Sequence, residues 1–268
     1  MKLIIFDTET NCLEMNNIEI WQFSGRCYDF NTQHIHDFNY RYKTKEPISY
    51  NARVRCKITQ EQVMTGKDFD VKDILNELYL NEDDVYYVGH NVGFDKNVLI
   101  NVLNKCGIPN IEVKNLFDKS VWIDTLRLAK QVYNEVEVTD CSGTNPISFS
   151  LEYLFHYLHL YDIDETLNFH DANFDVEVTF RLLKFLCNEL KLDIKTELPK
   201  IVDLSNTPVM ISRFAFGKHK GELIKDVIER DLGYIRWIIK DSGMCDQDNT
   251  SYSEDMLYTL ERLMDGAD

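Results

Sequence analysis

The sequence predicts a mixed α/β fold in which helices cover a β-sheet, followed by a small helix-rich C-terminal module. Strand-like apolar segments come first and then alternate with segments of helical spacing, the order expected when helices pack on a mixed sheet. The chain of 268 residues is 44% hydrophobic and 28% charged, as in water-soluble globular proteins with one sizeable core.

The first half of the chain contains three strand-like segments before its first helix. The expected elements are, in order, strands at 2–6, 17–30 and 34–43, a helix at 71–80, a strand at 85–91 and a helix at 94–107. The last of these helices ends at Gly107, and Pro109 just beyond it is a helix-stop signal.

The second half of the chain is predominantly helical. Residues 121–132 predict a short strand that runs into a helix. A polar loop rich in turn-forming residues is expected at 134–146. Two further helices are expected at 148–160 and 171–190.

A change in composition marks the expected domain boundary. Residues 192–211 lack a clear period and contain two prolines, which predicts a linker. Irregular, proline-bearing composition is typical of a boundary between folding units. We therefore expect a main domain at 1–191 and a small C-terminal module at 212–268.

The composition restricts the kinds of partner and the compartment. The formal net charge of −16 argues against nucleic-acid binding through the whole surface, but it permits a local basic groove or carboxylates that bind cations. No apolar stretch approaches the roughly 20 residues needed to span a bilayer, so no membrane partner is expected. The seven cysteines form no CxxC pair, and scattered thiols favour a reducing cytoplasm over a disulfide framework or a zinc site.

Two carboxylates stand one residue apart at the end of the first predicted strand, in FDTET. Alternation along a strand points Asp7 and Glu9 to the same face. Their proximity costs repulsion and desolvation unless a positive charge lies between them. An ordinary polar strand end is the alternative, and these residues alone do not decide between the two.

Further candidates stand where a strand gives way to a helix. GHNVGFDKNVL places Asp95 at the first turn of a helix, and HDANFDVEVTF places His170 just before a helix that carries Asp175. Taken singly, each acid is also explained as a charge that the helix dipole favours, and His170 as a loop residue. Carboxylate oxygens suit hard Mg²⁺ or Mn²⁺, and no Cys/His cluster competes for a softer metal.

Three of these stretches, in this order, resemble the motifs of a nuclease superfamily. FDTET is similar to the first motif, HNVGFDKNVL to the second and HDANFD to the third motif of the DEDD exonucleases, in their histidine-bearing, DnaQ-like branch (DEDDh). The resemblance implies a ribonuclease H-like mixed sheet flanked by helices and a 3′→5′ exonuclease activity. The spelling of the second motif also makes His90 a turn residue rather than a rival base.

The C-terminal stretch is similar to the tail of the exodeoxyribonuclease X subfamily. The resemblance rests on an FGK-x-x-G turn and the D-x-GY-x-x-W helix that follows it. Two features depart from the family. Cys12 stands where family members usually carry a glycine, and the loop at 134–146 looks longer than in the family.

The resemblance implies a role for each residue of the constellation. Asp7 would bridge two Mg²⁺ ions, for which Mn²⁺ would substitute. Glu9 and Asp175 would complete the first cation site, and Asp95 would support the second. His170 would act as general base toward the attacking water, since imidazole is the side chain that titrates nearest neutrality.

Six residues are expected to contact nucleic acid: Thr8, Leu13, Asn91, Phe94, Lys218 and Lys220. Asn91 would also hold the turn that aims Asp95, and core packing explains Phe94 equally well. The two lysines lie in the FGKHKG turn of a locally basic tail, whose interleaved aromatic residues suit single-strand binding. Tyr234 and Trp237 are better explained as the core of that tail.

The sequence therefore predicts a metal-dependent 3′→5′ exodeoxyribonuclease that releases nucleoside 5′-monophosphates, in DNA repair, recombination or turnover. The expected partner is a DNA 3′ end, single-stranded rather than duplex, in the cytoplasm of a bacterial or phage-infected cell. Two alternatives stay open: an exoribonuclease that trims RNA, and a polymerase-associated proofreading or nucleic-acid-binding subunit. The oligomeric state is left open.

Overall fold

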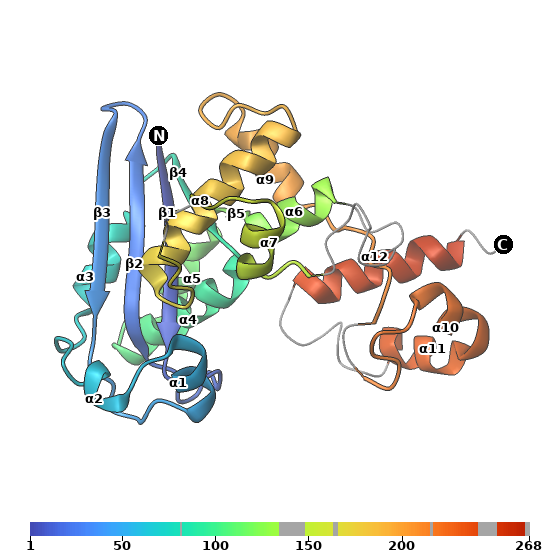
Figure 1. Cartoon of the computed structure of the whole chain (residues 1–268), viewed down its shortest axis with the longest axis horizontal. Helices are drawn as coiled ribbons and strands as arrows, with labels where there is room; N and C mark the ends of the chain where they lie inside the picture. The colour runs from blue at the N-terminus through green and yellow to red at the C-terminus, as the bar shows by residue number, and fades with distance from the viewer. Residues whose placement is uncertain (81, 134–147, 163–165, 215–216, 241–250, 266–268) are drawn as a thin grey trace.

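A five-stranded mixed sheet forms the middle layer of the main part of the chain, at the left of Figure 1, in the strand order β3-β2-β1-β4-β5. The computed structural model describes residues 1–80, 82–133, 148–162, 166–214, 217–240 and 251–265. β1 pairs antiparallel with β2 and parallel with β4, so it lies in the middle of the sheet. The strands are β1 (Lys2–Thr10), β2 (Ile20–Asp29), β3 (His34–Arg41), β4 (Val85–Gly89) and β5 (Val121–Asp124).

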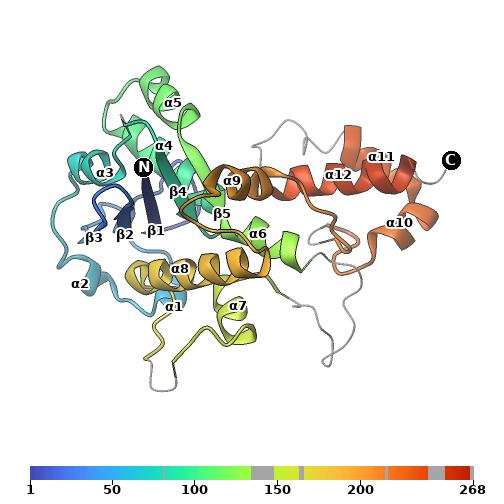
Figure 2. The same cartoon turned by 90° about the horizontal axis from the view of Figure 1, so that it is seen from above.

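Helices cover both faces of the sheet, which gives three layers (Figure 2). Ile4 and Phe6 of β1 point into one apolar core, and Leu3 and Ile5 point into the other, because side chains alternate along a strand. The helices over the first core are α3 (Val71–Leu78), α4 (Val92–Lys105) and α5 (Asn110–Asp118). Those over the second are α6 (Thr125–Val132), α7 (Leu151–Tyr157), α8 (Ala172–Glu189) and α9 (Leu198–Asn206).

β1 is longer than the predicted strand at 2–6. It continues to Thr10 because Thr8 and Glu9 still pair with β2, opposite Phe23 and Gln22. The carboxylates of the first motif therefore lie within the strand rather than just beyond it. By alternation they share the face of Leu3 and Ile5, which α8 covers.

Two short helices between β3 and α3 were not expected from the pattern. They are α1 (Tyr50–Cys56) and α2 (Gln60–Val63). Ser49 caps α1 by accepting the N–H of Ala52, and Thr59 begins α2 with a capping box. α1 has no buried residue and α2 has one, so neither shows the apolar period from which longer helices are predicted.

The linker expected at 192–211 is corrected by the structure, because α9 (Leu198–Asn206) occupies its middle. Pro199 is compatible with this helix since it stands in the first turn, where its missing N–H breaks no helical hydrogen bond. Leu198 and Ile201 are buried in the core shared with α6 and α8. The packed main part of the chain thus extends beyond residue 191. The loop expected at 134–146 lies outside the described residues.

The C-terminal module forms a third apolar core, drawn at the right of Figure 1. Its helices are α10 (Ile224–Arg230), α11 (Leu232–Lys240) and α12 (Ser251–Asp265). Buried Asp255 of α12 joins the module to the main part, because it accepts Lys130 Nζ of α6 at 2.9 Å and the N–H of Val209 at 3.0 Å. Among the described residues, no helix is long and apolar enough to cross a membrane.

Candidate active site

Three elements bring the predicted carboxylates together around the C-terminal half of β1. Asp7 and Glu9 come from β1 itself, on the face that α8 covers. Asp175 comes from the first turn of α8 and Asp95 from the first turn of α4, and both are buried. The negative charges of Asp95, Asp175 and Glu9 all raise the pKa of Asp7, after burial as the main cause. Residues far apart in the sequence therefore form one acidic cluster.

Asp95 is held in place by the middle residue of the first motif. Thr8 donates to Asp95 Oδ1 twice, from its hydroxyl at 2.5 Å and from its backbone N–H at 3.0 Å. Asn91, just before α4, adopts a left-handed conformation (φ 63°, ψ 45°) and donates its N–H to Asp124 Oδ1 at 2.9 Å. This turn starts α4 at the point that lets Asp95 reach β1.

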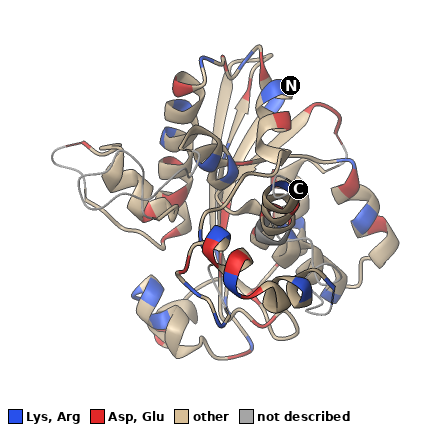
Figure 3. Cartoon of the chain, turned by 90° about the vertical axis from the view of Figure 1, so that its right-hand side faces the viewer, with Lys and Arg blue, Asp and Glu red and all other residues tan. Residues whose placement is uncertain are grey.

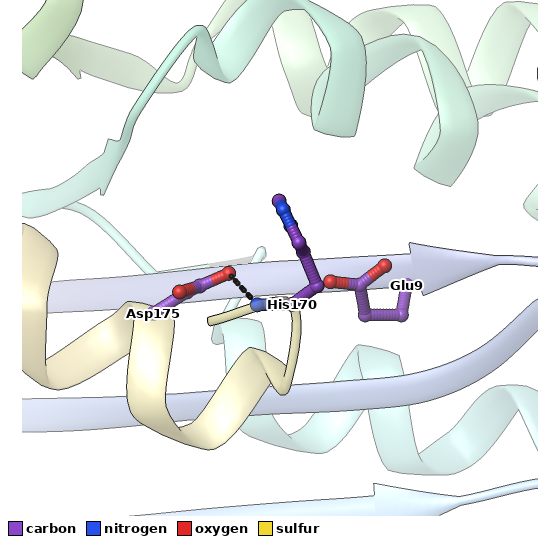
Figure 4. A group of neighbouring side chains, drawn as sticks. All are labelled: Glu9, His170 and Asp175. Carbon is purple, nitrogen blue, oxygen red and sulfur yellow. Dashed lines mark hydrogen bonds between the residues drawn. The ribbon is translucent and has the colours of Figure 1, made fainter. Parts of the chain in front are cut away.

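His170 lies beside Glu9 and Asp175, as Figure 4 shows. One potential ligand atom from each of these three side chains lies within 4.8 Å of the others. The backbone N–H of His170 donates to Asp175 Oδ2 at 3.1 Å, and His170 itself adopts a positive φ of 65°. The loop before α8 and the first turn of that helix are thus tied to each other at the site.

The residue after His170 fastens this loop to the sheet. Asp171 caps α8, accepts Arg41 Nη2 at 2.7 Å and accepts Gln22 Nε2 at 3.2 Å. Gln22 is fully buried, and its Oε1 also accepts the N–H of Ala172 at 3.3 Å. Sequence analysis missed both partners. The signal for Gln22 was a polar residue within an apolar strand, whereas nothing local marked Arg41.

The electrostatics of the cluster are unfavourable without a cation. Burial raises the pKa of Glu9 to about 8 and the pKa values of Asp95 and Asp175 to about 7. Burial and the neighbouring carboxylates raise the pKa of Asp7 well above its ordinary value. Asp175 Oδ1 is buried without a hydrogen-bond partner. Orphaned carboxylate oxygens in a crowded acidic site are the donors that a hard divalent cation requires, so the residues present fit one.

Arg55 of α1 is a positively charged residue beside His170 that sequence analysis did not identify. Its Nε–H donates to His170 Nδ1 at 3.2 Å. Burial, and then the charge of Arg55, lower the pKa of His170 from its ordinary value. The imidazole is therefore neutral near neutral pH, which is the form that a general base needs.

His90, the other histidine of the second motif, has a structural environment. Its ring nitrogens contact Thr125 Oγ1 at 3.0 Å and the carbonyl of Phe149 at 2.8 Å. Burial lowers the pKa of His90 to about 4. Both nitrogens are thus occupied, in agreement with its interpretation as a turn residue.

Comparison with known families identifies the family of this chain. The family model described as "Exonuclease" matches residues 4–183, which is more than half of the chain and includes the whole acidic cluster and His170. The chain belongs to the exonuclease family. The description "Exodeoxyribonuclease X-like C-terminal" matches residues 214–242 of this exonuclease, which confirms the predicted resemblance of its tail. Divalent-metal dependence and 3′→5′ direction are general in the family.

Known relatives agree with this assignment. The exonuclease is 25% identical over 236 residues to exodeoxyribonuclease 10 of Escherichia coli strain K12, covering 88% of this chain and 90% of the relative. A solved exonuclease X in complex with 5′-overhanging duplex DNA is 22% identical, with a TM-score of 0.52 over 76% of this chain and 99% of that one. E. coli exonuclease I with a dA16 oligonucleotide is 18% identical, with a TM-score of 0.54 over 75% and 42%. The ribonuclease H-like fold is thereby confirmed.

The residues expected to touch nucleic acid in the main part of the exonuclease differ in exposure. Leu13 is 72% exposed beyond the end of β1, whereas Phe94 is partly buried against the core of α4. Thr8 is buried and its hydroxyl is used by Asp95. Cys12, at the position of the family glycine, does not adopt a positive φ, so a residue with a side chain fits this loop.

The two lysines of the FGKHKG turn are exposed, and they differ in their partners. Lys218 Nζ contacts Asp231 Oδ2 at 2.7 Å, an oxygen that also lies 3.0 Å from His219 Nε2. Lys220 makes no ion pair within the described residues. Trp237 stacks on Tyr234 with ring centroids 5.6 Å apart, yet remains 46% exposed, so it is only partly a core residue.

Proposed function

We propose that this exonuclease is a divalent-metal-dependent 3′→5′ exodeoxyribonuclease that removes nucleoside 5′-monophosphates from DNA 3′ ends. The observation that carries the proposal is the cluster of four carboxylates beside His170, in which Asp95 and Asp175 are buried and Asp175 Oδ1 lacks a hydrogen-bond partner. DNA as the polymer is supported by the names of the relatives, an exodeoxyribonuclease and an exonuclease X bound to DNA.

The carboxylates of Asp7, Glu9, Asp95 and Asp175 would hold two Mg²⁺ ions, and Mn²⁺ would substitute for them. Such a cation pair, when bound, supplies positive charge to the attacking and leaving oxygens of an in-line displacement. The crowding of the four acids supports this assignment, because their charged forms become favourable only with a cation among them. Thr8 orients Asp95 within the set through two hydrogen bonds to one oxygen.

His170 acts as the general base in this proposal. Its neutral imidazole accepts a proton from the water that attacks the last phosphodiester. The bond between that phosphorus and the 3′ oxygen of the preceding nucleotide breaks, which leaves a new 3′-OH. Asp171, through Gln22 and Arg41, keeps the His170 loop against the sheet.

The substrate strand enters as a single-stranded 3′ end, flanked by exposed Leu13 and by Phe94. Asn91 contributes by setting the turn before α4. Lys218 and Lys220 contact the backbone farther along the strand. The thiols of the described cysteines are free, which supports the reducing cytoplasm of a bacterial or phage-infected cell, with a role in DNA repair, recombination or turnover.

Digestion of end-labelled substrates tests the proposal. Single- and double-stranded DNA and RNA, labelled at the 5′ end, are incubated with Mg²⁺, with Mn²⁺ and with EDTA. We expect stepwise shortening of DNA from the 3′ end, faster for the single strand, release of 5′-monophosphates and no cleavage in EDTA. Preferential shortening of RNA would identify an exoribonuclease instead. Binding without cleavage under every condition would identify a nucleic-acid-binding or proofreading-associated subunit.

A further inference from the structure

Helix α1 (Tyr50–Cys56) touches the candidate active site at its C-terminal end. Arg55 donates to His170 Nδ1 at 3.2 Å, and the thiol of Cys56 donates to Glu9 Oε2 at 3.2 Å. The rest of α1 is exposed or partly exposed, since the helix contains no buried residue. Two consecutive side chains of a helix without a buried residue therefore contact the proposed base and a proposed cation ligand.

The contact between Arg55 and His170 fixes the protonation of the imidazole. A guanidinium can only donate, so Nδ1 must accept, and a neutral imidazole then carries its proton on Nε2. A neutral imidazole has one basic lone pair, and here Arg55 occupies it. His170 cannot take a proton from water while this hydrogen bond persists.

Arg55 also lacks an anionic partner within the described part of the chain. Among the residues that the structure describes, Arg55 makes no ion pair, and it is exposed. By contrast, Arg53 of the same helix donates its Nε–H to the carbonyl of Ile48 at 3.0 Å. An exposed guanidinium beside an acidic cluster is free to bind an incoming phosphate bidentately.

We propose that Arg55 is a substrate-binding residue that exchanges His170 for a backbone phosphate when the DNA strand enters. In the free protein, Arg55 occupies the lone pair of His170. In the complex, its guanidinium binds the non-bridging oxygens of a phosphodiester near the 3′ end, and the lone pair of His170 becomes available to water. The inference rests on the proposed function, because it requires a nucleic-acid strand in the site.

Binding without turnover is the first test. The affinity for a fluorescent single-stranded DNA is measured in EDTA over a series of salt concentrations, for the wild type and for Arg55→Met, Arg55→Lys and Arg53→Met. We expect Arg55→Met to weaken binding about 10- to 100-fold, the range for one charged hydrogen-bonded contact. Its salt dependence should become shallower by about 0.7 in slope. Arg55→Lys should recover part of the affinity, and Arg53→Met should bind like the wild type.

The state of the imidazole is the second test, by ¹⁵N NMR of the His170 side chain in EDTA. In the wild type, we expect the Nδ1 resonance to shift when the oligonucleotide is added, as the Arg55 hydrogen bond breaks. In Arg55→Met, the free protein should already show the resonance of the released imidazole. A Nδ1 resonance unchanged by DNA in the wild type would overturn the exchange of partners.

Kinetics separate this inference from the function on which it rests. If the wild type degrades DNA, Arg55→Met should raise KM about 10-fold or more with a smaller change in kcat. A faster kcat with unchanged KM would show that Arg55 only blocks His170, and unchanged binding and kinetics would show that it has no role. Either result overturns the inference and leaves the exonuclease intact. A wild type without nuclease activity would instead overturn the proposed function.

Discussion

Buried acids occur in two regions of the molecule, and the two regions compensate them differently. Around β1 and α8, Asp175 is buried with its Oδ1 unpartnered. In the C-terminal module, Asp255 is also fully buried, but Lys130 and the N–H of Val209 bind its two oxygens at 2.9 and 3.0 Å. Figure 3 shows acidic and basic positions close together on the helices of this module, which face the viewer.

The same contrast appears in the pKa values. Burial raises the pKa of Asp175 to about 7. In the module, hydrogen bonds from Lys218 and His219 hold the pKa of Asp231, which is partly exposed, well below its ordinary value. An acid whose charge is matched by the protein stabilises the fold, whereas an acid left unmatched requires a ligand. This difference, rather than acidity itself, separates the candidate catalytic region from the structural one.

Removing a carboxylate from the acidic cluster around β1 and α8 should have the largest effect. We expect Asp7→Asn to abolish DNA cleavage, a loss of about 10³-fold or more, because several kcal/mol of cation-dependent charge stabilisation is lost. Thermal unfolding in EDTA should show an unchanged or higher Tm, since one of several repelling charges is gone. Asp226→Asn, at an exposed position of α10, is the matched control. Near-normal cleavage by Asp7→Asn would refute the cation assignment.

The next largest effect is expected from removing the proposed general base, His170. We expect His170→Ala to lower kcat by roughly 10²- to 10⁴-fold, the range for lost general-base catalysis. Divalent-cation binding, followed by calorimetry, should persist. The imidazole lies within 4.8 Å of ligand atoms of Glu9 and Asp175, so calorimetry is the decisive measurement. Loss of cation affinity in this variant would make His170 a ligand instead of the base.

The candidate site was largely predictable from the sequence because its residues lie in short local motifs. Asp7, Glu9, Asp95, His170 and Asp175 stand at fixed offsets from strand ends and helix starts, and the structure brings them together. The sheet and its covering helices were predictable for a similar reason, since apolar periodicity records which face of each element is buried.

The parts that escaped prediction depend on contacts between distant segments. Arg55 reaches His170 from a short helix without an apolar period, 115 residues away in the sequence. Gln22 and Arg41 hold Asp171 across 149 and 130 residues. The sequence predicts a linker where α9 lies, because Pro199 and the short length of this helix leave no clear helical pattern. Packing against the core stabilises it instead. No local pattern encodes such partners.

In the C-terminal module, removing an acid that has charged or hydrogen-bonding partners should lower stability rather than activity. We expect Asp255→Ala to lower the free energy of unfolding by about 3–5 kcal/mol, because it leaves Lys130, whose side chain is only 12% exposed, without its partner. Asp68→Ala is the control: Lys43 and Asp68 are both exposed (41% and 93%), so their ion pair should be worth about 1 kcal/mol or less. Chemical denaturation measures both. Equal effects would show that burial does not distinguish the two acids.

Stability as a function of pH should mainly reflect the acidic cluster around β1 and α8, and His90 opposes it below about pH 6.5 because burial lowers its pKa. Burial raises the pKa of Glu9 to about 8 and of Asp175 to about 7, so the folded protein binds more protons than the unfolded chain between about pH 4 and 8. The free energy of unfolding in EDTA should therefore fall as the pH rises through this window. A divalent cation at 100 times its Kd should restore about 2.7 kcal/mol. A pH-independent Tm in EDTA would contradict the raised pKa values.

The smallest effect on cleavage is expected from the FGKHKG turn of the C-terminal module. Its two lysines allow the comparison between partnered and unpartnered charges to be made within one turn. Lys218 is engaged by Asp231, whereas Lys220 makes no ion pair within the described residues. Truncation before Ser212 should leave a domain that still cleaves, because every proposed cation ligand precedes it, but that is destabilised as in Asp255→Ala, since Lys130 loses the same partner. It should bind DNA more weakly, with a shallower salt dependence. Lys220→Ala alone should reduce the slope of that dependence by about 0.7 on single-stranded DNA and leave kcat unchanged, as for a single phosphate contact. Lys218→Ala should change the slope less, since Asp231 already balances its charge. If neither variant alters the affinity for DNA or the slope of its salt dependence, the turn is a structural cap of the module, and the C-terminal module takes no part in binding the strand.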